Sequence, residues 1–147
     1  MLSIFLTDAP INDVDELNVY IAELKVKPDG GPVERFASTV GLVDLLTLQN
    51  GVTDLLGQDP VEARTYQFIE LLLDEDLSYV VETATGEQKP LKIPSEKIKI
   101  AGGPFEVLAD GTTSVTVDFD AEKSLKKTGN GRFQLKPFVS IVQVVQN

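Results

Sequence analysis

The feature that most constrains this chain is the regular recurrence of turn signals between short apolar runs. Turn sequences such as KPDGGP at 27–32 and GGP at 102–104 recur about every ten residues. The runs between them alternate apolar and polar residues, which is the period-two pattern of strands. This spacing predicts about nine short strands with at most one short helical turn. We therefore expect residues 1–147 to form a single all-β domain, a two-layer β-sandwich.

The C-terminal block, residues 112–145, carries the strongest strand pattern. Val115, Val117 and Phe119 are predicted to point to one face, and Asp118 and Asp120 to the other. The run that ends the block has apolar residues on both faces. Such a strand is expected to be covered on both faces, either where one sheet packs against another or where one subunit packs against another. Self-assembly into oligomers or filaments is therefore one hypothesis, which light scattering would separate from a monomer.

Other segments give more local predictions. The apolar phase slips by one residue at 22–23, which indicates a β-bulge in a long strand. Residues 66–73 read as a buried central strand that an acidic turn at 74–76 closes. Asp110-Gly111 predicts a hairpin between 105–108 and the strand that begins at 112. Residues 52–57 fit a single helical turn.

The composition excludes several kinds of chemistry. With 13 basic against 23 acidic residues, the net charge of −10 repels nucleic acid and anionic membrane surfaces. The chain has no histidine, cysteine or tryptophan, which excludes serine–histidine and cysteine–histidine nucleophile systems and thiolate or imidazole metal ligands. No run approaches the ~20 apolar residues of a membrane-spanning helix. A hard, oxygen-ligated cation is the metal chemistry that remains.

A set of aspartates forms the first candidate site. Asp118 and Asp120 lie two residues apart on one expected strand face, while Asp8 ends the first expected strand and is followed by Asp13 and Asp15. If the two strand ends lie side by side, several carboxylates converge in the way that calcium requires. The open alternative is that these aspartates cap turns, accept backbone N–H bonds or face water. Calcium is thus a cofactor hypothesis.

Paired carboxylates also serve glycosidases, so a carbohydrate-active enzyme using Asp118, Asp120 or Asp8 is the alternative function. The sequence marks no cleft. The aromatic residues, Phe138 among them, fall mostly in apolar strand phase and are expected in the core. A concave pocket that joins the carboxylates to exposed aromatics would promote the enzyme hypothesis.

The loop at 123–132 is rich in basic residues and glycine. Lys126, Lys127, Asn130 and Arg132 are therefore candidates for binding an acidic partner, including a neighbouring copy of the chain. The alternative is a solvated turn whose lysines offset nearby carboxylates.

Several motifs together resemble the domain-of-unknown-function family 4382. They follow the family's order over nearly the whole chain and comprise LTDAP at 6–10, VD at 14–15, NVYI at 18–21, DLLTLQNG at 44–51, DFDAEKS at 118–124, TGNG at 128–131 and LKP at 135–137. The chain departs from the family at 62–66, where the family tends to have a Pro-Ala-Gly-x-Tyr turn. The resemblance implies a β-sandwich of transthyretin-like or immunoglobulin-like topology. It also implies an exported bacterial or archaeal domain, commonly behind a lipoprotein-type signal, and no assigned enzyme activity.

We therefore expect a non-enzymatic exported or cell-surface module for adhesion, assembly or ligand binding, with structural calcium as an open element. A protein or surface glycan is the expected kind of partner, a homo-oligomer is an open alternative, and nucleic acid is not expected. Met1 is followed by no basic n-region. The expected periplasmic or extracellular location therefore assumes that the natural signal sequence has been removed.

Overall fold

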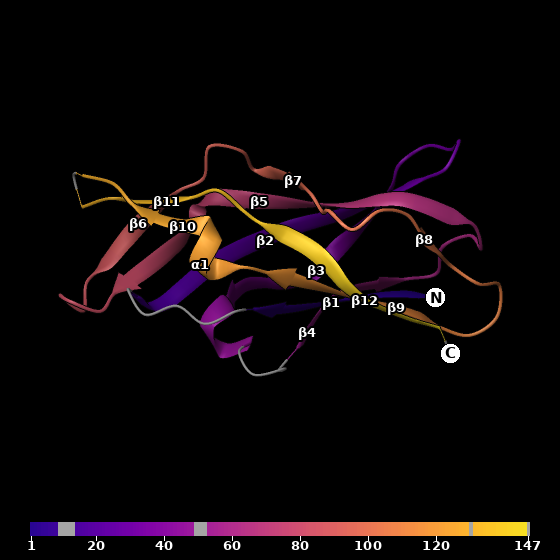
Figure 1. Ribbon diagram of the computed structural model, residues 1–147, viewed down its shortest axis with the longest axis horizontal. Helices are drawn as coiled ribbons and strands as arrows, with labels where there is room; N and C mark the ends of the chain where they lie inside the picture. The colour runs from indigo at the N-terminus through magenta and orange to yellow at the C-terminus, as the bar shows by residue number, and fades with distance from the viewer. Residues whose placement is uncertain (9–13, 49–52, 130, 147) are drawn as a thin grey trace.

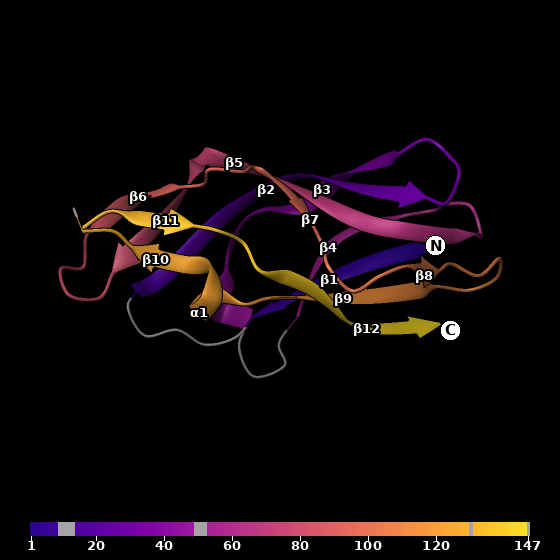
Figure 2. The ribbon, with the colours of Figure 1, turned by 45° about the horizontal axis from the view of Figure 1, so that its top comes forward.

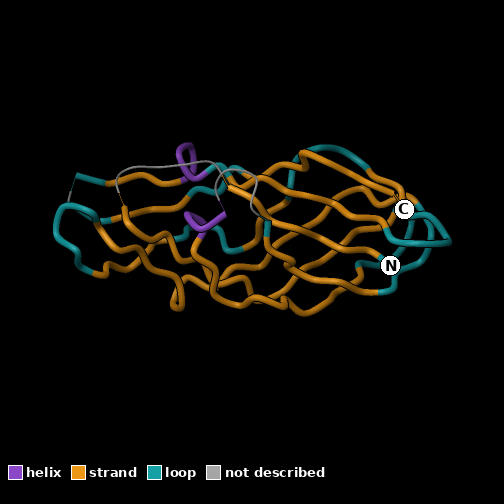
Figure 3. Tube along the Cα trace, turned by 90° about the horizontal axis from the view of Figure 1, so that it is seen from below, coloured by secondary structure: helices purple, strands orange, loops and turns teal. Residues whose placement is uncertain are grey.

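A computed structural model describes residues 1–147 except 9–13, 49–52, 130 and 147. The described residues form two β-sheets that pack face to face, so the prediction of an all-β sandwich is confirmed. Figure 1 shows an elongated molecule with the N- and C-terminus at the same end. Figure 3 shows how little of the described chain is helical.

The smaller sheet has four strands. Their order is β12 (Val139–Gln146), β9 (Thr113–Phe119), β1 (Leu2–Asp8) and β4 (Asp54–Asp59). The strand β1 is therefore central, antiparallel to β4 and parallel to β9. Residues 54–57 belong to β4, so the prediction of a helical turn there is wrong.

The larger sheet has eight strands. Their order is β10 (Leu125–Lys127), β11 (Phe133–Leu135), β6 (Gln88–Lys92), β5 (Thr65–Glu82), β2 (Val14–Pro28) and β3 (Glu34–Asp44), while β7 (Lys97–Lys99) and β8 (Phe105–Glu106) also pair with β5.

The described residues thus contain more strands than the sequence predicted, because runs of two or three residues are too short to show a period. They also contain two helical turns, η1 (Leu45–Leu48) and α1 (Ala121–Ser124), where at most one was expected. The second turn begins where the carboxylate of Asp120 accepts a hydrogen bond from the Lys123 N–H at 3.1 Å.

The long antiparallel pair β2–β5 forms the spine of the larger sheet. The predicted bulge at 22–23 is confirmed, since the register of β2 shifts between Ile21 and Glu23 against both neighbours. The predicted end of the strand at 74–76 is wrong. This acidic stretch leaves the ladder between Asp74 and Tyr79, and the Ser78 hydroxyl fills the gap by accepting from the Tyr20 N–H and donating to the Asp74 carbonyl.

The predicted hairpin at Asp110-Gly111 is also wrong. The strand β8 pairs with β5, where the rings of Phe105 and Tyr66 stack with their centroids 5.7 Å apart. The strand β9 instead lies in the smaller sheet between β1 and β12. Residues 107–112 therefore carry the chain from one sheet to the other, although their turn residues are those of a tight hairpin.

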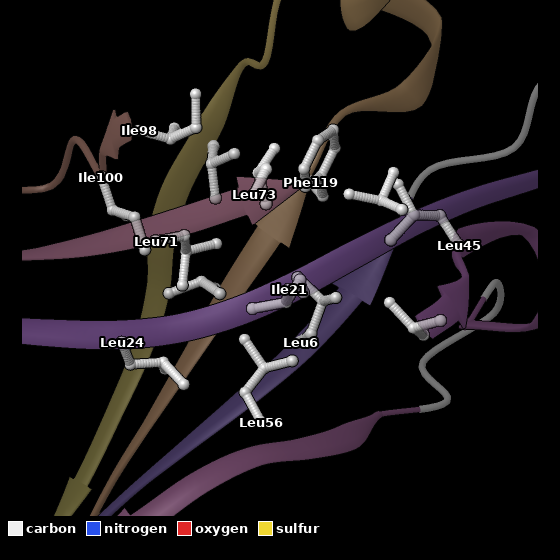
Figure 4. Packing of buried hydrophobic residues seen from close by; sticks show 14 of the residues in the cluster. Leu6, Ile21, Leu24, Leu45, Leu56, Leu71, Leu73, Ile98, Ile100 and Phe119 are labelled. Carbon is white, nitrogen blue, oxygen red and sulfur yellow. The ribbon is translucent and has the colours of Figure 1, made fainter. Parts of the chain in front are cut away.

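The hydrophobic core lies between the two sheets and confirms the predicted alternation. Figure 4 shows Leu6, Leu56 and Phe119 of the smaller sheet facing Ile21 and Leu71 of the larger one. All five are almost completely buried. Burial of a side chain of this size contributes about 1.5–3 kcal/mol, so the sheet-to-sheet contact supplies most of the stabilisation.

The C-terminal block does not form one long central strand. It divides at Lys136-Pro137 into β11 of the larger sheet and β12, which is the outermost strand of the smaller sheet (Figure 2). Val142 and Val144 of β12 are 56% and 40% exposed. The expectation that both faces of this run are covered by packed sheets is therefore wrong, and the run does not continue as one strand because a proline cannot continue the ladder. Contact between subunits through this strand stays a prediction.

The outer side of β12 is joined to the larger sheet by the segment that follows β7. The Ala101 N–H donates to the Val139 carbonyl at 3.1 Å, and the Ile141 N–H donates to the Ala101 carbonyl at 2.8 Å. We call this join, residues 99–103 with 137–141, the seam. The backbone at Gly102 (φ 128°) passes so close to β12 that a Cβ there would lie 2.8 Å from the Ile141 Cβ.

We predict that Gly102→Ala destabilises the fold much more than Gly103→Ala. Both glycines have positive φ, which costs an alanine about 1–2 kcal/mol. An added Cβ at Gly103 meets nothing within 4 Å, whereas at Gly102 it collides with β12. The Gly102 variant is therefore expected to lose more than about 3 kcal/mol. Urea unfolding of both variants measures this, and equal losses would contradict a tight seam.

Candidate functional site

Two of the predicted aspartates line one hollow on the seam side of the molecule. Asp118 lies on β9 in register with Thr7 of β1 and Ser140 of β12, on the face away from the core, and Asp120 follows directly after β9. We call this hollow of about 340 Å³ the aspartate pocket; its lining residues are Lys99, Ala101, Asp118, Asp120, Lys123, Pro137, Phe138, Val139 and Ser140.

The charges in this pocket are mixed. Partial burial and the neighbouring Asp120 carboxylate raise the pKa of Asp118. Asp120 has a structural role, because its carboxylate caps α1. Lys99 and Lys123 line the same pocket, although neither forms an ion pair with Asp118 or Asp120 among the described residues. The pocket therefore offers both hydrogen-bond acceptors and charged donors.

Phe138 stands at the same pocket with 53% of its surface exposed, so the expectation that it belongs to the core is wrong. Its N–H donates to the Ser124 hydroxyl at 2.8 Å, which holds this part of the chain against α1. Because Pro137 interrupts the strand, the apolar phase before it does not continue through Phe138. One pocket thus joins two carboxylates to an exposed aromatic ring, the arrangement that favours a carbohydrate site.

Among the residues that the structure describes, none of the other predicted metal ligands, Asp8, Asp13 and Asp15, lines this pocket. Asp15 lies on β2 of the larger sheet, where its carboxylate accepts a hydrogen bond from the Thr83 hydroxyl at 2.9 Å. The backbone of Asp8 pairs with Phe119, so the ends of β1 and β9 lie side by side as expected. The Asp8 side chain and the whole of Asp13 lie outside the described residues. Within the described part of the chain, no three acidic side chains gather closely enough to hold a metal ion.

The predicted basic loop belongs to the antiparallel pair β10–β11 at the edge of the larger sheet. Lys126 and Arg132 are exposed there, and Asn130 lies outside the described residues. The Lys127 ammonium is 2.7 Å from the carboxylate of Glu82, which also lies 2.9 Å from Lys89. Since Glu82 is only 4% exposed, Lys127 holds the β10–β11 pair onto β5.

A second hollow, which the sequence analysis missed, adjoins the aspartate pocket and shares Lys99 and Pro137 with it. We call it the lysine groove; its volume is about 410 Å³, and its lining residues are Pro94, Ser95, Lys97, Ile98, Lys99, Leu135, Lys136 and Pro137. Its lysines come from two distant segments and form no basic run. The available signal was the Lys-Ile-Lys alternation of 97–99, which places both lysines on one strand face.

We predict that Glu82 makes the fold sensitive to acid. Hydrogen bonds from Lys127 and Lys89 lower the pKa of Glu82 from 4.5 to about 2. A carboxyl whose pKa is lowered by folding stabilises the protein above its unfolded pKa. This contribution is therefore complete above pH 4.5 and is lost as the pH falls toward 2.

Glu82→Gln should lower the free energy of unfolding at pH 7 and flatten its pH dependence between these two values. Denaturant unfolding across this pH range measures both effects. Parallel curves for the variant and the wild type would show that the pair with Lys127 contributes nothing.

Comparison with known families identifies the chain. The family described as Domain of unknown function (DUF4382) matches residues 1–137 of the 147. The match includes the two aspartates of the aspartate pocket and the lysines of both hollows. No curated protein and no solved structure matches the chain. Over the part that the structure describes, no helix is both long and apolar enough to cross a membrane. With its motifs and its match in agreement from β1 to β11, the chain belongs to the DUF4382 family.

Proposed function

We propose that this chain is a non-enzymatic, exported module of the cell surface that binds a glycan in the aspartate pocket. The observation that carries the proposal is the position of Asp118, Asp120 and the exposed ring of Phe138 around one hollow. Export and surface location rest on the motifs shared with the family, and adhesion is the role that such binding would serve.

The chemistry of the pocket suits a hydroxyl-rich ligand. The carboxylates of Asp118 and Asp120 accept hydrogen bonds, and Lys99 and Lys123 donate them, so both capacities of a sugar hydroxyl can be used. The Phe138 ring offers an apolar surface to the C–H face of a sugar ring. A volume of about 340 Å³ lies in the range of small-molecule sites.

The carboxylate arrangement favours binding over hydrolysis. A glycosidase places its two carboxyl groups on opposite sides of the scissile bond, one as acid and the other as base or nucleophile. Here both groups come from one strand end, and Asp120 already caps α1. The raised pKa of Asp118 is nevertheless the property of a general acid. It supports a carbohydrate-active enzyme as the second candidate function.

We predict that Phe138→Ala weakens glycan binding about fivefold, because an aromatic contact of this kind contributes about 1 kcal/mol. Calorimetric titration with neutral, uronic and amino-sugar oligosaccharides measures the affinity. Val142→Ala is the matched control, since Val142 is equally exposed but lies outside the pocket.

If the wild type releases reducing sugar and Asp118→Asn does not, the protein is a carbohydrate-active enzyme and not a binding module. Absence of binding to every saccharide class, or equal losses in the Phe138 and Val142 variants, would contradict the assignment of the pocket.

Structural calcium is a separable part of the proposal. Asp118 and Asp120 stand beside the end of β1, where Asp8 pairs with Phe119. We predict that millimolar calcium raises the melting temperature of metal-stripped protein more than magnesium does. A free calcium concentration of a hundred times the dissociation constant adds about 2.7 kcal/mol to the free energy of unfolding.

The calcium-selective rise should be absent in Asp118→Ala and should persist in Asp15→Ala, whose carboxylate lies on the other sheet. If calcium causes no rise, these aspartates hold no calcium, and their roles are helix capping and glycan binding.

A further inference from the structure

The lysine groove lies between two segments that run alongside each other toward the seam. One wall is β7, which carries Lys97 and Lys99, and the other is the connection from β11 to β12 with Lys136 and Pro137. Ala101 and Ser140 form a parallel bridge just beyond the groove. The two walls are therefore joined by backbone hydrogen bonds at the seam and separate from each other before it.

The groove has a strong local positive charge. Three lysines and no acidic residue line it, in a chain whose acidic residues outnumber the basic ones by 23 to 13. The ion pairs among the described residues involve other basic side chains, and none involves Lys97, Lys99 or Lys136. Lys99 lies 4.3 Å from the centre of the Phe68 ring, a contact that leaves its charge uncompensated.

Asp118 and Asp120 line the adjoining pocket with Lys99 but form no ion pair with it among the described residues, and the carboxylates nearest to β7 in the sheet are used elsewhere. Glu70 stands opposite Lys99 in the β5–β7 register and forms its ion pair with Lys25 at 3.9 Å. Glu96 accepts a hydrogen bond from the backbone of Glu75 at 2.9 Å. The ammonium groups of the groove are therefore available to an anion from outside.

The backbone of β7 has an open edge on the groove side. The Glu96 carbonyl and the Ile100 N–H bond to β5, whereas the Ala101 N–H bonds to β12 on the opposite side. Since the hydrogen-bonding groups of a strand alternate between its two sides, those of Lys97 and Lys99 point the same way as those of Ala101. There they face the β11–β12 connection, where Pro137 has no N–H and the Lys136 N–H donates to Ser124. The Lys97 carbonyl accepts from the Ser95 hydroxyl at 3.1 Å, so the Lys97 N–H and both backbone groups of Lys99 are the ones that this edge offers.

We propose that the lysine groove binds an extended acidic polypeptide segment, which adds to the open edge of β7 as a further strand. The segment's backbone pairs with Lys97 and Lys99, and its carboxylates contact the three ammonium groups. Because Lys97 and Lys99 share one strand face, the segment needs acidic residues at alternate positions. Pro94 and Pro137 provide apolar surface for the stems of the side chains.

A polypeptide fits these observations better than a simple anion does. Strand addition derives its affinity from backbone donors and acceptors, and β7 supplies the Lys97 N–H and the Lys99 N–H and carbonyl beside the charges. This inference does not depend on glycan binding, because the aspartate pocket shares only Lys99 and Pro137 with the groove.

The test is fluorescence anisotropy of the full chain with a labelled octapeptide of alternating glutamate and threonine. Lys97→Ser should weaken binding about tenfold, the size expected for removing one close charge contact. Lys126→Ser is the matched control, since Lys126 is an exposed lysine on β10 outside the groove, and it should change the affinity less than twofold. The Lys97 variant should melt at the wild-type temperature.

Two further probes separate strand addition from general charge attraction. A peptide of the same composition with its four glutamates in one block should bind about tenfold more weakly, and a glutamine–threonine peptide should not bind. The amide of Lys99 should exchange with solvent more slowly in the complex.

Equal losses in the Lys97 and Lys126 variants would overturn the proposal in favour of the basic loop. Equal binding of the two acidic peptides, or equally tight and Lys97-dependent binding of polygalacturonate, would overturn strand addition. No binding at all would leave the lysines as charges that keep an open strand edge from pairing with other chains.

Discussion

Directional hydrogen bonds between the two sheets hold them in one relative position, and the seam, where the backbone of Ala101 exchanges two hydrogen bonds with β12, is the backbone join among them. The core between the sheets supplies most of the stabilisation, but hydrophobic contact is non-directional and does not fix how one sheet lies over the other. The seam helps to fix it, together with the hydrogen bonds from Gln146 to the Glu106 carbonyl and from Thr39 to the Leu55 carbonyl, and Gly102 allows the close approach. Because Pro137 cannot extend this pairing, the walls separate on one side and leave the lysine groove, while Asp118 and Asp120 open onto the other. The same join thus holds the fold and shapes both hollows.

Local pattern was sufficient to predict the class of fold but not its pairing. The alternation in β9 and the phase slip in β2 are properties of neighbouring residues, and both predictions are confirmed. Asp110-Gly111 misled because the same turn residues serve a hairpin and a crossing between sheets; the partner strands β5 and β1 lie far away in the sequence. The acidic stretch at 74–76 misled for a related reason. The Ser78 hydroxyl, reaching Tyr20 on another strand, helps β5 to continue past it.

The candidate site was predicted in the same partial way. The spacing of Asp118 and Asp120 placed both at one pocket, because two residues is the repeat of a strand. Phe138 was assigned to the core from its apolar neighbours, and the break at Pro137 exposes it. The basic loop drew attention because its lysines are close in sequence, yet Lys127 is bound to Glu82. Lys97, Lys99 and Lys136 meet only through the fold, which no local pattern reports.

We infer that the seam side of the sandwich is the binding face of this protein. Amide chemical-shift mapping of the ¹⁵N-labelled chain tests it most directly, with saccharide and acidic peptide added in turn and together. We expect the largest shifts within 97–103 and 135–141, with the saccharide shifting amides at the aspartate pocket and the peptide shifting amides at the lysine groove. Shifts that gather around Lys126 and Arg132, or on the salt-bridged face around Glu23 and Arg35, with the seam unchanged, would contradict it.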